Sequence, residues 1–141
     1  MAGYVTAFGV GALAGIANEL LQNHNHWCLT SPNLAKVLAT CTIGNIYGWA
    51  AMISVGLFGV ASRRNIPWWV QVLTATVAIA GVEGAAGVIS RKFHDGEQKW
   101  KYPACWYPIF GDSVSLVSTV YFGLGVLAFY WLAYKPLLSK I

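Results

Sequence analysis

Two acidic residues, Glu19 and Glu83, interrupt long apolar stretches of the sequence. A carboxylate in the interior of a membrane costs about 2.5–3.5 kcal/mol on insertion scales, so such a residue is a candidate for function. The pair could form a proton or cation site, or could act as catalytic carboxylates. Alternatively, each carboxylate anchors a nearby loop by accepting hydrogen bonds from loop amides, Trp indoles or a cation. We expect Glu19 to be such an anchor and keep both roles open for Glu83.

The segment after Glu83 supplies partners for an anchor of this kind. It begins with Arg91 and continues through Trp100 and Tyr102 in a stretch rich in aromatic residues and prolines. A connection over residues 91–113 is long for a compact helical bundle, so we predict that it packs as an aromatic cap. Arg91, Trp100 and Tyr102 are the predicted cap partners of the carboxylates.

A second polar loop, between the first two apolar stretches, contains His24, His26 and Cys28 and could bind a metal ion. All three are residue types that bind zinc or copper, and His94 lies in the later loop. However, alternate positions in a loop are not a standard finger spacing, and the fourth ligand would have to come from elsewhere. We therefore predict interfacial histidines and no metal, with bound lipids in place of a cofactor.

A disulfide is the second alternative for this loop. Cys28 and Cys105 are expected on the same side of the protein, and each is adjacent to a tryptophan in the sequence. If that side is oxidising, a bond between the two loops would form. Cys41 lies inside an apolar stretch and is expected to be a small packing residue.

The composition determines the class of protein that these residues belong to. The chain has 141 residues, of which 57% are hydrophobic and only 10% are charged, against roughly 25% charged in soluble domains. So few charged residues cannot cover a soluble surface, whereas a surface that faces lipid needs none. The net charge is +4, but the basic residues lie singly or in pairs at the ends of apolar stretches. This pattern is typical of membrane flanks and argues against nucleic-acid binding.

A transmembrane helix needs about 20 predominantly apolar residues, and four stretches of the sequence qualify. They are residues 4–22, 35–61, 67–90 and 114–134. We therefore predict an all-α, multi-pass integral membrane protein, in which residues 1–141 form a single domain of four transmembrane helices. The helices would form two hairpins, with the aromatic loop cap on one side.

The orientation of these helices does not follow from the positive-inside rule, because basic residues are balanced between the two sides. The expected terminal side carries Arg63, Arg64, Lys135 and Lys140, and the loop side carries Lys36, Arg91, Lys92, Lys99 and Lys101.

Each half of the chain has the same order of features, which suggests a parallel internal repeat. An apolar helix with a late Glu is followed by a polar loop with Trp and Pro, and then by a helix that contains Gly. The first half provides Glu19, Trp27, Pro32, Gly44 and Gly48, and the second provides Glu83, Trp100, Pro103, Gly111 and Gly123.

This order of features resembles the CmpB-like family, also labelled ABC-transporter type IV, which includes the eukaryotic transmembrane protein 229 group. The resemblance covers most of the chain. It is carried in the first half by Glu19, Asn25, Trp27 and Tyr47–Gly48, and in the second half by Glu83, Gly87, Arg91, Phe93, Trp100, Tyr102 and Gly111.

One position departs from the family pattern. The family has an acidic residue between the Trp and the Tyr of the cap, where this chain has Lys101. If that acid is catalytic or binds an ion in the family, this chain lacks the activity. The transporter label implies little more, because the chain has no nucleotide-binding domain and few helices for a permease.

Three classes of function follow from these observations. The first, which we favour, is an accessory or structural subunit of a larger membrane protein complex, with other membrane subunits and lipids as partners. The second is a small transporter or channel that works as a homo-oligomer around Glu83. The third is a membrane enzyme in which Glu19 and Glu83 act on a lipid-like substrate. We expect no enzymatic activity and assign no catalytic residue.

Overall fold

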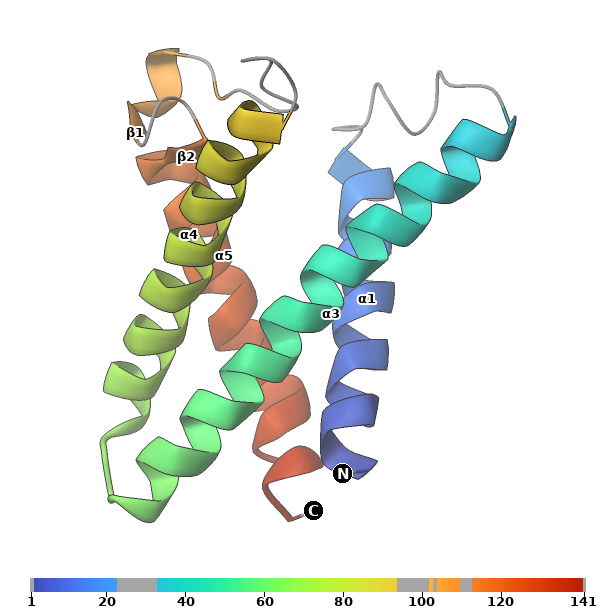
Figure 1. Cartoon of the computed structure of the whole chain (residues 1–141). Coiled ribbons are helices and arrows are strands. Elements are labelled where there is room, and N and C mark those ends of the chain that lie inside the picture. Colours follow the sequence, from blue (N-terminus) through green and yellow to red (C-terminus); the bar gives the residue numbers. More distant parts are fainter. Residues whose placement is uncertain (1, 23–32, 94–101, 103, 110–112, 141) are drawn as a thin grey trace. The chain divides into compact units, whose positions relative to one another are not determined.

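The computed structural model describes residues 2–22, 33–93, 102, 104–109 and 113–140. For residues 2, 18–22, 33–44, 90 and 93 it describes the backbone alone. The chain is mostly helical, which confirms the predicted all-α class (Figure 1). The long helices are α1 (Ala2–Gln22), α3 (Asn33–Arg63), α4 (Trp68–Phe93) and α5 (Leu116–Phe129). The short elements are η1 (Ala104–Trp106), β1 (Pro108–Ile109), β2 (Val114–Ser115), the π-helical turn η2 (Tyr130–Tyr134) and η3 (Leu138–Lys140).

Three stretches of these helices have the length and apolar composition needed to cross a membrane. They are Asn45–Arg63, Trp68–Ile89 and Leu116–Tyr134, within the part of the chain that the structure describes. The apolar stretch of α1, Gly3–Ala17, is shorter than a span. The observed helices therefore follow the predicted stretches closely. Three of the four meet the length criterion among the residues searched, and residues 18–22 at the end of α1 lie outside that search.

A tight turn connects α3 to α4. Asn65 adopts a positive φ of 53°, and the amide of Ile66 donates to the carbonyl of Ala61 at 3.0 Å while the amide of Asn65 donates to Ser62 at 3.1 Å. These bonds form a Schellman motif, in which Asn is one of the few residues that tolerates the left-handed position. The motif ends α3 and allows α4 to begin directly after Pro67, a residue suited to the start of a helix.

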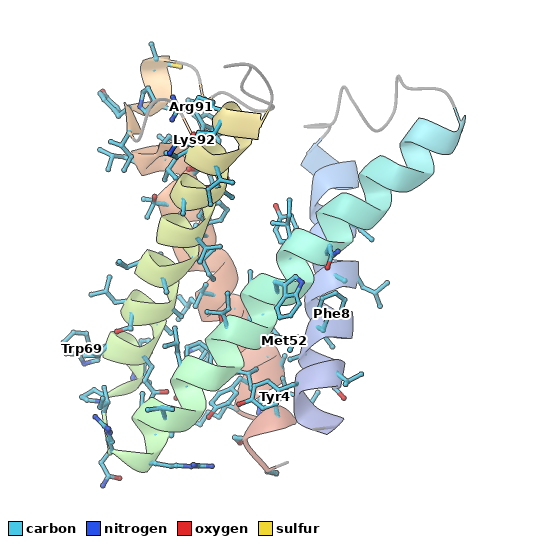
Figure 2. All side chains as sticks on the ribbon, in the orientation of Figure 1. Tyr4, Phe8, Met52, Trp69, Arg91 and Lys92 are labelled. Carbon is cyan, nitrogen blue, oxygen red and sulfur yellow. The ribbon has the colours of Figure 1, made fainter. Side chains whose placement is uncertain are left out.

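The chain divides into two units, Met1–Gly56 with Leu132–Ile141 and Leu57–Trp131. In the first unit, α1 packs closely on α3 through glycines. A Cβ atom at Gly11 would lie 2.5 Å from that of Ala51, and one at Gly48 would lie 2.6 Å from the ring of Phe8. Phe8 also makes an edge-to-face contact with Trp49 at 6.2 Å between ring centroids. Figure 2 shows Phe8 and Met52 at this contact between the helices.

In the second unit, α4 packs along α5, and the short β1–β2 pair lies at the end of both helices (Figure 1). Gly123 of α5 faces Thr76 of α4, because a Cβ atom at Gly123 would lie 3.5 Å from the Thr76 methyl group. The Thr76 hydroxyl donates to the carbonyl of Val72 within α4 at 2.8 Å. The hydroxyl is thus satisfied inside its own helix, and Glu83 lies further along α4, toward the β1–β2 end.

Candidate functional site at the Glu83 cap

Glu83 lies on α4, inside the apolar stretch Trp68–Ile89. Its Oε1 atom accepts a hydrogen bond of 2.8 Å from the hydroxyl group of Tyr102. Its Oε2 atom is buried and has no hydrogen-bond partner among the described residues. Burying a polar atom without a hydrogen bond costs free energy. The bond from Tyr102 offsets this cost at Oε1 but not at Oε2. The carboxyl group is therefore half satisfied by the described part of the cap.

A row of aromatic rings holds Tyr102 in place. The ring of Tyr102 stacks on that of Trp106 in η1, with 5.7 Å between centroids and 19° between planes. Trp106 then contacts Tyr121 of α5 at 6.1 Å. Such contacts contribute about 0.5–1.5 kcal/mol per pair beyond the burial of area. They connect the residue that binds Glu83 to α5, so the hydroxyl does not depend on the loop backbone alone for its position.

The β1–β2 pair joins the cap to the beginning of α5. Pro108 is opposite Ser115, and Ile109 is opposite Val114, in an antiparallel register. The positive φ of Tyr107, 54°, turns the chain into β1, and the amide of Leu116 donates to the Tyr107 carbonyl at 3.2 Å. The pair therefore fixes where the cap meets the first turn of α5.

Serines form the buried base of this cap. Ser115 is the N-cap residue of α5, and its hydroxyl accepts from the amide of Ser118 at 2.8 Å. In return, the amide of Ser115 donates to the Ser118 hydroxyl at 3.0 Å, which completes a capping box. Ser113 lies directly against Gly87 of α4, one turn after Glu83, where even a methyl group would collide with it. Gly87 is thus required for the close approach of the cap to α4.

The described residues bring together one of the predicted carboxylates and one of its predicted partners, Glu83 and Tyr102. Arg91, another predicted partner, is half-buried at the C-terminal end of α4 (Figure 2). Trp100 lies outside the described residues, and Glu19 belongs to α1 with a side chain that is not described. The shared site of Glu19 and Glu83 therefore stays a prediction.

The predicted metal ligands His24, His26, Cys28 and His94 also lie outside the described residues. In the part of the chain that is described, no group of three His, Cys, Asp or Glu side chains could hold a metal ion. Cys105 is exposed in η1, and its predicted disulfide partner Cys28 is outside the described part, so this bond stays a prediction too.

Sequence reasoning did not assign Trp106, Tyr121, Ser113 or Ser115 to the site. The Ser-x-x-Ser pattern at 115–118, directly before an apolar stretch, is a helix-start signal that could have located the N-cap. Trp106 was part of the predicted aromatic cap, but its position between Tyr102 and Tyr121 depends on the packing of α5 and has no local signal.

Comparisons of the chain with protein-family models, with curated proteins and with solved structures found no match. The resemblance to the CmpB-like family therefore stays a prediction from the residues that carry it.

Proposed function

We propose that this chain is a multi-pass integral membrane protein and serves as an accessory subunit of a larger membrane protein complex. The apolar stretches support a membrane location, because no more than 28% of any of the three is buried inside the chain. Large side chains such as Leu73, Val77, Val120 and Leu124 are more than half exposed. Contact of these side chains with lipid or with other transmembrane helices is favourable, whereas their exposure to water is unfavourable.

The observation that carries the subunit role is an apolar hollow on α4. Its volume is about 340 Å³, and its described lining consists of Gly81, Gly84, Ala85, Val88 and Ile89. A Cβ atom at Gly81 would meet nothing within 4 Å. On the same helix, a Cβ atom at Gly87 would collide with Ser113. Among the described residues of this unit, the small residues of α4 therefore meet the cap at Gly87, whereas no atom lies within 4 Å of a Cβ atom at Gly81.

Small residues let transmembrane helices approach closely, and this packing drives helix association in lipid, where the hydrophobic effect is absent. The residues that line such a hollow lose dispersion contacts unless a complementary surface packs into it. We infer that a transmembrane helix of a partner subunit occupies the hollow at Gly81 and Ala85.

A photo-crosslinking amino acid at position 85 tests this inference in native membranes, with position 120 of α5 as the matched control. Val120 is 63% exposed and is not among the described residues that line the hollow. We expect position 85 to form one product of defined mass with a different chain, and this product to disappear in the Gly81→Leu variant. Equal, diffuse products at both positions, or a product made of two copies of this chain, would contradict the proposed role.

A second candidate function has one observation in its favour. The buried Oε2 atom of Glu83 has no partner among the described residues, and an unsatisfied carboxylate oxygen at membrane depth is a feature of proton and cation pathways. Transport by the purified chain in vesicles, lost in Glu83→Gln and kept in Tyr107→Phe, would favour this candidate. Absence of flux in vesicles that contain the folded chain would exclude it.

A further inference from the structure

The turn between α3 and α4 presents two adjacent arginines on a rigid backbone. Arg63 is the last residue of α3, and Arg64 follows it in the Schellman motif closed by Asn65. Both side chains are exposed. Among the residues that the structure describes, neither guanidinium group has a hydrogen bond or an ion pair.

A buried glutamine braces this turn from α4. Gln71 is only 4% exposed, and its Nε2 atom donates to the carbonyl of Ile66 at 2.7 Å. Its Oε1 atom accepts from the Ser62 hydroxyl at 3.3 Å. These bonds tie both sides of the turn to the first turns of α4. The two arginines are therefore held at a preformed site and are not on a loop that must order upon binding.

The described residues of this unit do not compensate the charge of the turn. The C-terminus of α3 contributes roughly −0.5 charge and the N-terminus of α4 roughly +0.5, so the two helix dipoles cancel and both full charges remain. No Asp or Glu occurs between Glu19 and Glu83 in the sequence. Glu83 lies about 22 Å from Trp68 along α4, at 1.5 Å per residue. Among the described residues of this unit, the turn thus lacks an acid close enough to pair with.

Exposed tryptophans surround the turn at the ends of the apolar stretches. Trp68 contacts Trp131 edge to face, at 5.6 Å between centroids, and Trp131 contacts Tyr130 at 5.5 Å. Trp69 is 57% exposed and points away from α4 (Figure 2). Trp side chains in such positions lie at the level of lipid headgroups. The arginines and the headgroup phosphates would therefore be at the same depth.

We propose that the Arg63–Arg64 turn binds the phosphate of an anionic phospholipid headgroup. The guanidinium groups match the phosphate oxygens in charge and in bidentate geometry, and the tryptophans contact the adjacent glycerol and acyl region. This inference rests on the proposed membrane location, but it does not depend on the partner helix at Gly81. The alternative is that both arginines are only solvated by water at the membrane surface, in which case they would show no lipid preference.

Native mass spectrometry of the detergent-solubilised full chain tests the proposal. The chain is titrated with phosphatidylglycerol or with phosphatidylcholine of the same acyl chains. We expect the first phosphatidylglycerol to bind about tenfold more tightly, since each basic residue near the membrane contributes a several-fold preference for anionic lipid. Arg63→Gln/Arg64→Gln should abolish this preference. The matched double variant Lys92→Gln/Lys140→Gln, which loses the same charge elsewhere, should keep it.

Two further measurements separate lipid binding from damage to the turn and from binding of free phosphate. Arg63→Lys/Arg64→Lys keeps the charge and should keep most of the preference. If the lysine variant loses it as completely as the glutamine variant, damage to the turn is the cause and the proposal is wrong. Equal binding of the two lipids by the wild type, or displacement of phosphatidylglycerol by millimolar inorganic phosphate, would also overturn it. Flotation with phosphatidylcholine vesicles tests the membrane location separately, because wild type and variants should all float.

Discussion

The Tyr102–Glu83 hydrogen bond is a direct polar contact between the cap and α4, and removing one atom at a time measures its strength. Tyr102→Phe removes only the hydroxyl and leaves Oε1 of Glu83 without its 2.8 Å donor. We expect the free energy of unfolding to fall by about 1–3 kcal/mol, the usual range for a buried acceptor that loses its partner. Denaturation of the chain in detergent micelles, followed by circular dichroism, gives this value.

The matched control is Tyr107→Phe, because Tyr107 belongs to the same loop but is 67% exposed. This variant should unfold like the wild type. Glu83→Gln should lose less stability than Tyr102→Phe, since the amide oxygen can still accept the hydroxyl proton. If Tyr102→Phe and Tyr107→Phe have the same stability, Glu83 does not anchor the cap.

Two glycines on α4 should respond to the same substitution with opposite signs. At Gly87, the methyl group of alanine would collide with Ser113, which is fully buried. We expect Gly87→Ala to lower the free energy of unfolding by about 1–3 kcal/mol, as overpacking does. At Gly81, nothing lies within 4 Å of the added atom, so Gly81→Ala should raise the stability of the isolated chain by up to about 1 kcal/mol through helix propensity.

Thermal unfolding of Gly87→Ala and Gly81→Ala in the same detergent measures these opposite effects. Adding Ser113→Gly to Gly87→Ala should recover most of the lost stability, because the collision is then removed. Equal effects at the two positions would mean that the cap does not pack on Gly87.

At the residue scale, the contact between Glu83 and Tyr102 could be predicted from the cost of burying an acid. An acid in an apolar stretch needs a partner, and Tyr102 in the next loop is that partner for Glu83. The contacts of Ser113 with Gly87 and of Trp106 with Tyr121 could not be predicted in this way. These contacts depend on how α5 packs beside α4, and no local pattern in the sequence predicts that packing.

At the scale of elements, the start of α5 depends on its capping box. The Ser115 hydroxyl satisfies the amide of Ser118 in the first turn of the helix. Ser115→Ala should lower the stability by about 1 kcal/mol, with greater loss of protection at the cap than along α4 in hydrogen exchange. Ser139→Ala is the control, since Ser139 is exposed and only donates to the carbonyl of Lys135. Equal protection of residues 113–118 in Ser115→Ala and wild type would contradict this role.

The helices themselves were predictable because apolar length is a strong signal. The predicted stretch 67–90 corresponds to α4 at Trp68–Phe93, and 114–134 corresponds to α5 with its π-helical last turn. The β1–β2 pair was not predicted. Its strands have two residues each, too short for the alternating pattern that indicates a strand.

At the scale of the whole molecule, no more than 28% of any of the three candidate spans is buried inside the chain. Lipid can cover the bulky side chains, but the hollow at Gly81 is lined partly by small residues, which are the residues that let transmembrane helices pack closely. This difference is the basis on which we propose a subunit role. The sequence shows the glycines, but only the structure distinguishes Gly87, which lies against Ser113, from Gly81, where a Cβ atom would meet nothing within 4 Å.

Extraction of the full chain from its native membranes in mild detergent tests the subunit role most directly, with the mass of the particle as the readout. We predict that wild type elutes with a stoichiometric partner chain. Gly81→Leu should elute without the partner, and its unfolding temperature should be no lower than that of the isolated wild-type chain, since a Cβ atom at position 81 meets nothing within 4 Å and leucine favours a helix more than glycine does. A wild-type chain that elutes as a stable monomer with nothing bound would contradict the subunit role.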